Sequence, residues 1–140
     1  MEIREQPDVS HRQAILDLLN IYNESMGAVY APKAFAILIR DPGEGQTTGG
    51  LWATCYYDWL HIELIFVPKE LRGRKIGARL VRSAEHWALQ RGCIGVWLDT
   101  FQFQAPAFYQ SLGYQAFGHL PNYPRGSRRY FLRKVFPEST

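Results

Sequence analysis

The feature that most constrains this sequence is an apolar run followed directly by a loop of glycine and basic residues. The run extends from Leu60 to Val67 and ends at Pro68, and the loop at positions 72–77 reads Arg-Gly-Arg-Lys-Ile-Gly. After the loop begins, apolar residues recur with helical spacing, at Ile76, Leu80, Ala84, Trp87 and Ala88. The pattern predicts a strand, a tight loop and a helix.

The start of such a helix is suited to bind an anion. Its first amides have no partner within the helix, and the helix dipole makes this end partly positive. Gly73 and Gly77 let the backbone approach a ligand without an intervening side chain. We therefore expect the loop to bind a phosphate or a pyrophosphate.

Length and composition predict one folded domain over residues 1–140. Of these residues, 46% are hydrophobic and 14% are aromatic, which excludes a disordered chain. No apolar run approaches the ~20 residues that span a bilayer. The charged residues 1–8 lack the apolar segment of a signal peptide. We expect a soluble, cytoplasmic protein that does not bind membranes.

The two cysteines, Cys55 and Cys93, both lie in apolar segments. Neither has the spacing to another cysteine or to a histidine that is typical of a metal site, so we expect no metal. Buried free thiols are the preferred interpretation, and a disulfide or a nucleophile are the alternatives.

The charge of the chain is concentrated in two basic segments. Residues 69–82 and residues 125–134 each carry a net charge of +5, whereas the whole chain carries +3 and the remainder is acidic. Two local patches on an otherwise acidic chain favour a small anionic ligand over a long polyanion. Nucleic-acid binding is not expected, because the sequence contains no motif for it.

Hydrophobic periodicity and turn residues predict ten secondary-structure elements. They are a short edge strand at 1–6, a helix that Ser10 caps and Gly27 ends, a meander of three strands at 34–40, 49–57 and 60–67, a helix at 74–92, a buried strand at 93–99, a short helix at 105–112, and strands at 114–120 and 129–135. This order predicts an α/β fold, a three-layer α/β/α sandwich with a mixed, mostly antiparallel central sheet.

Two segments resemble motifs of a known family. Residues 67–78, VPKELRGRKIGA, resemble the acyl-CoA pyrophosphate loop (Arg/Gln-x-x-Gly-x-Gly/Ala) of the Gcn5-related N-acetyltransferases (GNAT), and residues 108–114, FYQSLGY, resemble their FYxxxGF segment. Over about residues 33–135 the chain is similar to a subgroup of small, uncharacterised bacterial members. The resemblance implies an enzyme that moves the acetyl group of acetyl-CoA to a primary amine of a small molecule, by direct attack in a ternary complex.

The resemblance also implies which residues bind the co-substrate. The loop would hold the pyrophosphate and the preceding strand would pair with the pantetheine arm, through Ile65, Phe66, Val67, Arg72, Gly73, Arg74, Lys75, Gly77, Ala78, Gln104 and Tyr109. Lys75 occupies the slot of the first motif glycine. If that slot requires a positive φ, Lys75 is strained by an amount on the order of 1 kcal/mol. Gln102 stands where the family often has an asparagine, and nearby Gln104 is the alternative amide.

Three residues are candidates for the catalytic steps. The amine must lose a proton, and in several family members a glutamate six residues before the motif valine takes it; His61 occupies that slot here. Glu63 lies two residues further on, on the same face of a regular strand and closer to the expected cleft. Tyr109 matches the family tyrosine whose hydroxyl points at the sulfur, so the resemblance implies that it protonates the leaving thiolate.

The acceptor is the least constrained part of the prediction. Aromatic residues could form a wall for an amine, and Asp58 or Asp99 could attract a cation; the aromatic candidates are Trp52, Tyr56, Tyr57, Trp59 and Tyr123. The arginines of the 121–129 loop would favour an acidic or phosphorylated acceptor. The alternatives are acetylation of a protein N-terminus or lysine, and a non-catalytic acyl-CoA-binding module. The sequence is compatible with a homodimer but does not fix the oligomeric state.

Overall fold

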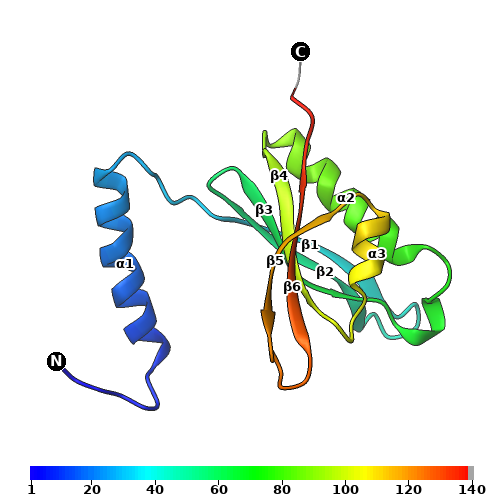
Figure 1. Ribbon diagram of the computed structural model, residues 1–140, viewed down its shortest axis with the longest axis horizontal. Helices are drawn as coiled ribbons and strands as arrows, with labels where there is room; N and C mark the ends of the chain where they lie inside the picture. Colours follow the sequence, from blue (N-terminus) through cyan, green and yellow to red (C-terminus); the bar gives the residue numbers. More distant parts are fainter. Residues whose placement is uncertain (139–140) are drawn as a thin grey trace.

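The computed structural model describes residues 1–138 and has one six-stranded mixed sheet with three α-helices (Figure 1). The strand order is β1-β2-β3-β4-β6-β5, and of the pairs in this described part only β3 and β4 run parallel. The predicted α/β class with a mixed, mostly antiparallel sheet is therefore confirmed. The elements are α1 (Val9–Ser25), β1 (Lys33–Arg40), β2 (Thr47–Tyr56), β3 (Trp59–Phe66), the 3₁₀ turn η1 (Lys69–Leu71), α2 (Ile76–Gln90), β4 (Gly95–Phe101), α3 (Pro106–Ser111), β5 (Gln115–Pro121) and β6 (Arg128–Val135).

The N-terminal predictions need two corrections. No strand forms over residues 1–6, because no neighbouring strand pairs with this segment. The cap of α1 is Asp8 rather than Ser10: the Asp8 carboxylate accepts hydrogen bonds from the amide and hydroxyl of Ser10, while the Asp8 amide donates to His11 Nδ1 over 2.8 Å. A carboxylate at this position also interacts favourably with the helix dipole. The helix ends as expected at Gly27, whose φ is +90°.

The predicted antiparallel meander of β1, β2 and β3 is present. Its second turn comes one residue earlier than the sequence indicates, because Tyr57 and Asp58 adopt φ values of 49° and 67°. Two left-handed residues in sequence form the type of two-residue turn that matches the twist of a hairpin. The other strand and helix boundaries differ from the predicted ones by a few residues.

The core lies between one face of the sheet and α2. Apolar side chains at helical spacing on α2 pack on alternate residues of the central strands, namely Leu80, Val81, Ala84 and Ala88 on Leu51, Ala53, Leu60, Ile62, Val96, Leu98 and Leu132. Helix α3 lies on the same side as α2, and the ring of Phe108 packs directly against Gly77. A Cβ at position 77 would lie 3.2 Å from that ring, so glycine permits this close contact.

A buried polar cluster fastens α2 to the C-terminal part of the sheet. Glu85, on α2, is only 8% exposed. Its carboxylate accepts a hydrogen bond of 2.8 Å from the Tyr114 hydroxyl and one of 3.1 Å from Lys134 Nζ, which also donates to the carbonyl of Leu112. Burial and the neighbouring Glu85 charge raise the pKa of Tyr114, so the phenol stays protonated and acts as a donor.

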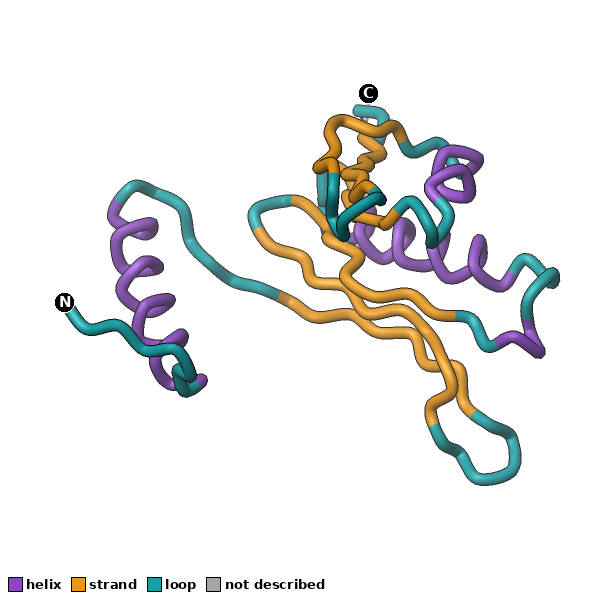
Figure 2. The backbone as a smooth tube through the Cα atoms, turned by 60° about the horizontal axis from the view of Figure 1, so that its bottom comes forward, coloured by secondary structure: helices purple, strands orange, loops and turns teal. Residues whose placement is uncertain are grey.

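Helix α1 stands apart from the rest of the molecule. Figures 1 and 2 show it beside the sheet, joined by an extended linker and not packed on either face. None of its residues is buried. The predicted α/β/α arrangement has three layers. Within this chain only two of them pack together, the sheet and the layer of α2 and α3, because α1 does not cover the other face.

The cysteines are free thiols, as preferred from the sequence. The two Sγ atoms of Cys55 and Cys93 lie 3.0 Å apart. Burial, followed by the contact with Cys55, raises the pKa of Cys93 to about 12. A thiol with such a pKa is almost entirely protonated at neutral pH, which argues against a nucleophilic role. None of the helices formed by residues 1–138 contains an apolar stretch that could span a lipid bilayer.

The buried cluster predicts the effect of removing one hydroxyl. Tyr114→Phe should lower the free energy of unfolding by about 1.5–3 kcal/mol, because the Glu85 carboxylate loses a charged hydrogen bond in a buried place. Urea unfolding followed by circular dichroism measures this change. Tyr130→Phe is the control, since no hydrogen bond of the Tyr130 hydroxyl occurs in the described part of the chain, and it should have little effect. Equal stability of the two variants would contradict the role of the cluster.

Candidate functional site

The parallel pairing of β3 with β4 ends halfway along both strands. It runs from Trp59 opposite Gly95 to Ile62 opposite Leu98, although β3 continues to Phe66 and β4 to Phe101. On its other edge β3 stays paired with β2 up to Phe66. The backbone groups of residues 63–66 that face β4 therefore have no strand partner, and such a free edge can pair with an extended ligand.

A bulge at Glu63 lies where the two strands separate. In the pairing of β2 with β3, Ala53 lies opposite Ile62 and Trp52 lies opposite Leu64, which leaves Glu63 as the extra residue. A bulge bends its strand and increases the local twist. It also interrupts the alternation on which the sequence argument for His61 and Glu63 depended. The Thr54 hydroxyl donates to the Glu63 carboxylate, and Thr54 itself lies opposite His61 in the register of β2 and β3.

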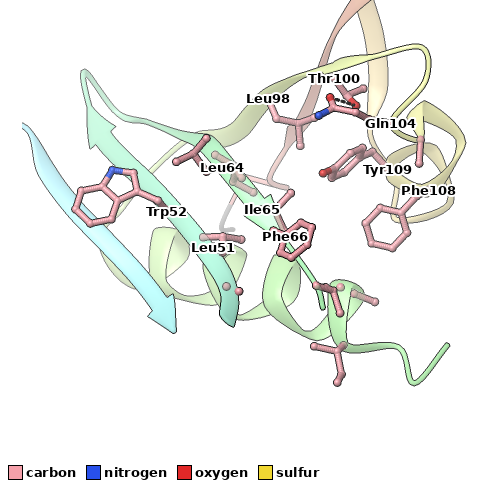
Figure 3. A pocket seen from close by; sticks show the side chains of 18 of the residues that line it. Leu51, Trp52, Leu64, Ile65, Phe66, Leu98, Thr100, Gln104, Phe108 and Tyr109 are labelled. Carbon is pink, nitrogen blue, oxygen red and sulfur yellow. Dashed lines mark hydrogen bonds between the residues drawn. The ribbon is translucent and has the colours of Figure 1, made fainter. Parts of the chain in front are cut away.

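A large cavity of about 1130 Å³ occupies the gap between the separated strands. Figure 3 shows Leu51, Trp52, Leu64 and Ile65 on one side of it and Tyr109 with Gln104 on the other. The loop before α2 closes one end, with Arg72, Gly73, Lys75, Gly77 and Ala78 among the lining residues. Most of the residues expected to bind the co-substrate thus line one continuous cavity.

In the loop before α2, Lys75 has the positive φ that was considered for the glycine position of the motif. Lys75 adopts φ 60° and ψ 23°, in the left-handed region, and no side chain caps the helix. The first hydrogen bond back to the cap runs from the Arg79 amide to the Lys75 carbonyl. The amides of residues 76–78 have no acceptor within the described part of the chain, so they remain available to an anion.

The basic side chains of this loop do not all have the same role. Arg72 turns back along β3, where its Nε donates to the Val67 carbonyl over 3.0 Å and its guanidinium lies 5.6 Å from the centre of the Phe66 ring. Arg72 therefore fastens the loop to the end of the strand. Arg74 and Lys75 are exposed at the helix start, where they add positive charge.

Tyr109 and Gln104 reach the cavity from the α3 side. Tyr109 is 8% exposed, and no hydrogen bond of its hydroxyl to another described residue occurs. Burial, with a smaller contribution from the Asp99 charge, raises the pKa of this phenol to about 12. Gln104 Oε1 accepts from the Phe101 amide over 2.9 Å and from the Thr100 hydroxyl, as Figure 3 shows in part, so its NH₂ group is not needed for this bond. Gln102 does not line the cavity.

His61 lies on the opposite face of the sheet from α2 and does not line the cavity. Its ring stacks on Trp97, with centroids 3.7 Å apart, and its Nε2 lies 3.6 Å from Asp99 Oδ2. This Nε2 is buried without a hydrogen-bond partner. Burial lowers the pKa of His61, and the Asp99 and Glu63 charges only partly offset it. The imidazole is therefore mostly neutral at pH 7.

An ion pair that the sequence did not reveal borders the cavity. The guanidinium of Arg129 donates two hydrogen bonds, of 2.6 and 3.0 Å, to Asp99 Oδ1. Three aromatic rings surround the guanidinium, those of Phe101, Tyr123 and Phe131. The positive charge of Arg129 is thus compensated by Asp99, although the sequence expectation was that the arginines near this loop would attract an acidic acceptor. Only the cross-strand register of β4 and β6 could have indicated the pair.

The aromatic residues proposed as an acceptor wall do not form one wall. Trp52 lines the large cavity. Tyr56 and Tyr57 instead line a small separate cavity near the linker that follows α1. Tyr123 stacks on Phe101 at the β5–β6 end of the sheet. Trp52 is therefore the member of the proposed wall that can contact an acceptor in the large cavity.

Comparisons with known proteins agree with this geometry. Residues 8–114 match the model of the acetyltransferase (GNAT) family, so the chain belongs to that family and is an acetyl-CoA-dependent acetyltransferase. Acetyltransferase Atu2258 of Agrobacterium fabrum is 33% identical over 129 residues, which are 92% of this chain and 93% of that protein. The blasticidin-S acetyltransferase of Streptomyces morookaense is 41% identical over 91 residues, 64% of this chain and 67% of the relative.

A crystal structure of a related protein extends the similarity to the N-terminal helix. The structure, of an Agrobacterium tumefaciens protein assigned to the acetyltransferases, superposes on 97% of this chain and 98% of its own with a TM-score of 0.90 and 31% identity. Residues 1–32 are 32 of 140, so a superposition that left them out could not exceed a TM-score of about 0.77. The detached position of α1 is therefore shared by that protein.

The environment of His61 predicts how stability depends on pH. Because the folded state lowers the pKa of His61, the unfolded state binds more protons as the pH falls below about 6.5, and stability is lost there. His61→Gln should reduce the loss of unfolding free energy between pH 7.5 and pH 5.5, measured by urea unfolding at each pH. His86→Gln, at an exposed position of α2, is the control and should keep the loss of the unaltered protein. A His61→Gln variant with the same pH dependence would contradict a buried neutral imidazole.

Proposed function

We propose that this protein transfers the acetyl group of acetyl-CoA to a primary amine of a small molecule, by direct attack within a ternary complex. The proposal depends above all on one observation, the end of β3–β4 pairing at Ile62 beside a cavity that reaches the amides at the start of α2. Such a gap gives an extended acyl carrier a strand edge to pair with and an anion site at one end. We further propose that residues 1–140 act as one catalytic domain.

In this proposal the co-substrate binds along β3 and the loop that follows. The free edge at Ile65, Phe66 and Val67 would pair with the pantetheine arm. The amides near Gly73, Gly77 and Ala78 would receive the pyrophosphate, and the exposed charges of Arg74 and Lys75 would add to its attraction. Arg72 would act indirectly by keeping the loop against the strand, and the free NH₂ of Gln104 would face the arm.

Binding in this way would place the thioester between the separated strands. Acetyl-CoA supplies an activated acyl group, and the protein's contribution is to hold the amine at attack distance and to exclude water. Trp52 and Leu64 offer apolar surface on the acceptor side of the cavity. The carboxylate of Glu63 would attract a protonated amine to the same place, since the charge of Asp99 is compensated by Arg129.

Glu63 is the preferred base of the two candidates. It lines the cavity at the bulge, whereas His61 is half-buried, stacks on Trp97 and does not line the cavity. The hydroxyl of Thr54 donates to Glu63 and would keep the carboxylate directed at the amine. His61 is neutral at pH 7 and could receive the proton through a water, since its Nε2 has no partner among the described residues.

Tyr109 is the preferred acid for the departing thiolate. A phenol with a pKa of about 12 is protonated throughout the neutral range, and the hydroxyl is free to donate to a ligand in the cavity. The family-like segment around it, residues 108–114, ends at Tyr114. The centroids of the Tyr109 and Tyr114 rings lie 6.2 Å apart, and the Tyr114 hydroxyl donates to the buried Glu85. These contacts would fix the direction of the hydroxyl.

The decisive experiment measures binding and turnover separately. Isothermal titration calorimetry with coenzyme A should give saturable heat, and mass spectrometry should detect an acetylated product when acetyl-CoA is supplied with a panel of amines. Blasticidin S belongs in the panel because a 41% identical relative is named for it. Peptides with free N-termini or lysines represent the alternative of protein acetylation. Binding without any product would favour a non-catalytic module, and no heat at millimolar coenzyme A would contradict the proposal.

The acid role predicts a specific loss in one variant. Tyr109→Phe should lower kcat by about 10- to 100-fold, because proton donation to the leaving group is lost. The dissociation constant of coenzyme A should stay nearly the same, since the ring is retained. Tyr130→Phe, whose hydroxyl lies outside the cavity lining, is the control and should keep full turnover. A Tyr109→Phe enzyme with unchanged kcat would rule out the role.

The two candidate bases predict different results. Glu63→Gln keeps the size of the side chain and a partner for Thr54 but cannot accept a proton, so it should lower kcat/KM by about 100-fold or more at pH 7. His61→Gln should cause a smaller loss if His61 only relays the proton. Initial rates over pH 6 to 9 would compare both variants with the unaltered enzyme. A larger defect in His61→Gln than in Glu63→Gln would reverse the assignment.

A further inference from the structure

Helix α1 carries an apolar stripe that nothing in its own chain covers. The stripe consists of five side chains at helical spacing that are 50–71% exposed, namely Ile15, Leu18, Leu19, Tyr22 and Met26. An isolated helix of this length is marginal in water, and most helices in proteins are stabilised by packing of such a stripe. The stripe therefore requires a partner surface.

The linker keeps α1 from reaching the sheet of its own chain in this arrangement. Tyr30 packs against both residues at the end of the β2–β3 hairpin, with ring centroids 5.5 Å from Tyr56 and 6.1 Å from Tyr57. Residues 27–29 line the small cavity beside the same hairpin. The chain is thus fastened at that end of the sheet, and α1 projects away from it (Figures 1 and 2).

The face of the sheet opposite α2 is the matching surface. Leu38, Trp52 and Leu64 lie on it and are 50%, 45% and 69% exposed. The register places these three on adjacent strands, because Trp52 is opposite both Ala36 and Leu64. A helix of 17 residues is about 25 Å long, and an eight-residue strand such as β1 is about 26 Å long. The stripe and this face therefore agree in length and in chemistry.

We propose that two copies of this chain exchange their N-terminal helices, so that α1 of each copy covers the open sheet face of the other. A reciprocal exchange is closed by two-fold symmetry and leaves neither stripe exposed. Charge favours the same contact: residues 1–26 carry five acidic and two basic residues, whereas the exposed Arg133 of β6, opposite Trp97 on the open face, has no acidic partner within residues 1–138.

The crystal structure of the Agrobacterium tumefaciens relative favours a helix held in a fixed position by a second copy, as opposed to a helix that is detached by chance. Its α1 region superposes together with the rest of the chain, as the TM-score requires. A helix that merely hung free in solution would have no reason to keep one position in a protein of 31% identity. A fixed position away from the parent sheet is the expected result when a second copy holds the helix.

The exchange would also complete the acceptor side of the catalytic cavity, an extension that rests on the proposed function. Trp52 and Leu64 belong both to the open face and to the lining of the large cavity. A helix from the second copy that packs on them would form a wall next to Glu63. Dissociation of the dimer should then raise KM for the amine more than the dissociation constant of coenzyme A, whose proposed site lies at the loop before α2.

The test determines which chain α1 contacts. Light scattering after size-exclusion chromatography should give the mass of a dimer. A photoreactive Tyr22→p-benzoylphenylalanine variant, prepared in light and ¹⁵N-labelled forms, would be refolded as an equal mixture and irradiated. Cross-links from position 22 to residues 33–66 should join heavy and light chains at the frequency of random pairing. Cross-links confined to one chain, or a monomeric mass, would overturn the exchange. None of these readouts needs coenzyme A, so failure here is distinct from failure of the transferase proposal.

Paired variants separate the stripe from the rest of the helix. Leu18→Gln with Tyr22→Gln should yield a monomer, whereas Asp17→Gln with Glu24→Gln, on the opposite side of α1, should remain a dimer. Circular dichroism during urea unfolding reports whether each variant is folded. If the stripe variant does not fold, the heavy–light cross-links of the otherwise unaltered sequence still decide the question. A stripe variant that is folded and dimeric would contradict the proposal.

Discussion

The separation of β3 from β4 is the constraint on which the rest of the site depends. Two parallel strands that stayed paired would fill the gap with their own hydrogen bonds and leave no cavity. The bulge at Glu63 bends β3 at the last paired residue, and the loop beyond β3 is fastened to the strand end by Arg72. The same short segment thus provides a free backbone edge, a carboxylate at the bend and a helix start with unused amides.

A few charged side chains line the cavity, and their signs differ from one part of it to another. Positive charge gathers where the helix dipole already favours an anion, near Arg74 and Lys75. The carboxylate of Glu63 lies further along the cavity, and Asp99 is neutralised by Arg129, which lies among aromatic rings. In the proposed reaction, an anionic carrier and a cationic amine would therefore be drawn to different parts of one cavity, an arrangement that opposes unproductive binding.

Local patterns predicted most of the elements and the two motif segments, because each depends on residues close in sequence. The strand, loop and helix around Gly73 and the α3 segment with Tyr109 are of this kind. The Glu63 bulge and the Asp99–Arg129 pair are not, since both follow from the register between strands. The sequence prediction placed the cap of α1 at Ser10 instead of Asp8, because both residues are good N-caps and each has a polar side chain three residues later. The position of α1 depends on a surface that periodicity alone does not identify.

The detached helix has a consequence for how this protein is made. If α1 finishes its fold on a second copy, a newly synthesised chain carries an incomplete layer until it meets another. The fraction of fully assembled protein would then rise with its concentration in the cell. At low concentration, unassembled chains would expose an apolar surface to chaperones or to aggregation. Leu38, Trp52 and Leu64 line the cavity and also form the exposed face, so substitutions at these residues would affect both the site and the tendency to aggregate.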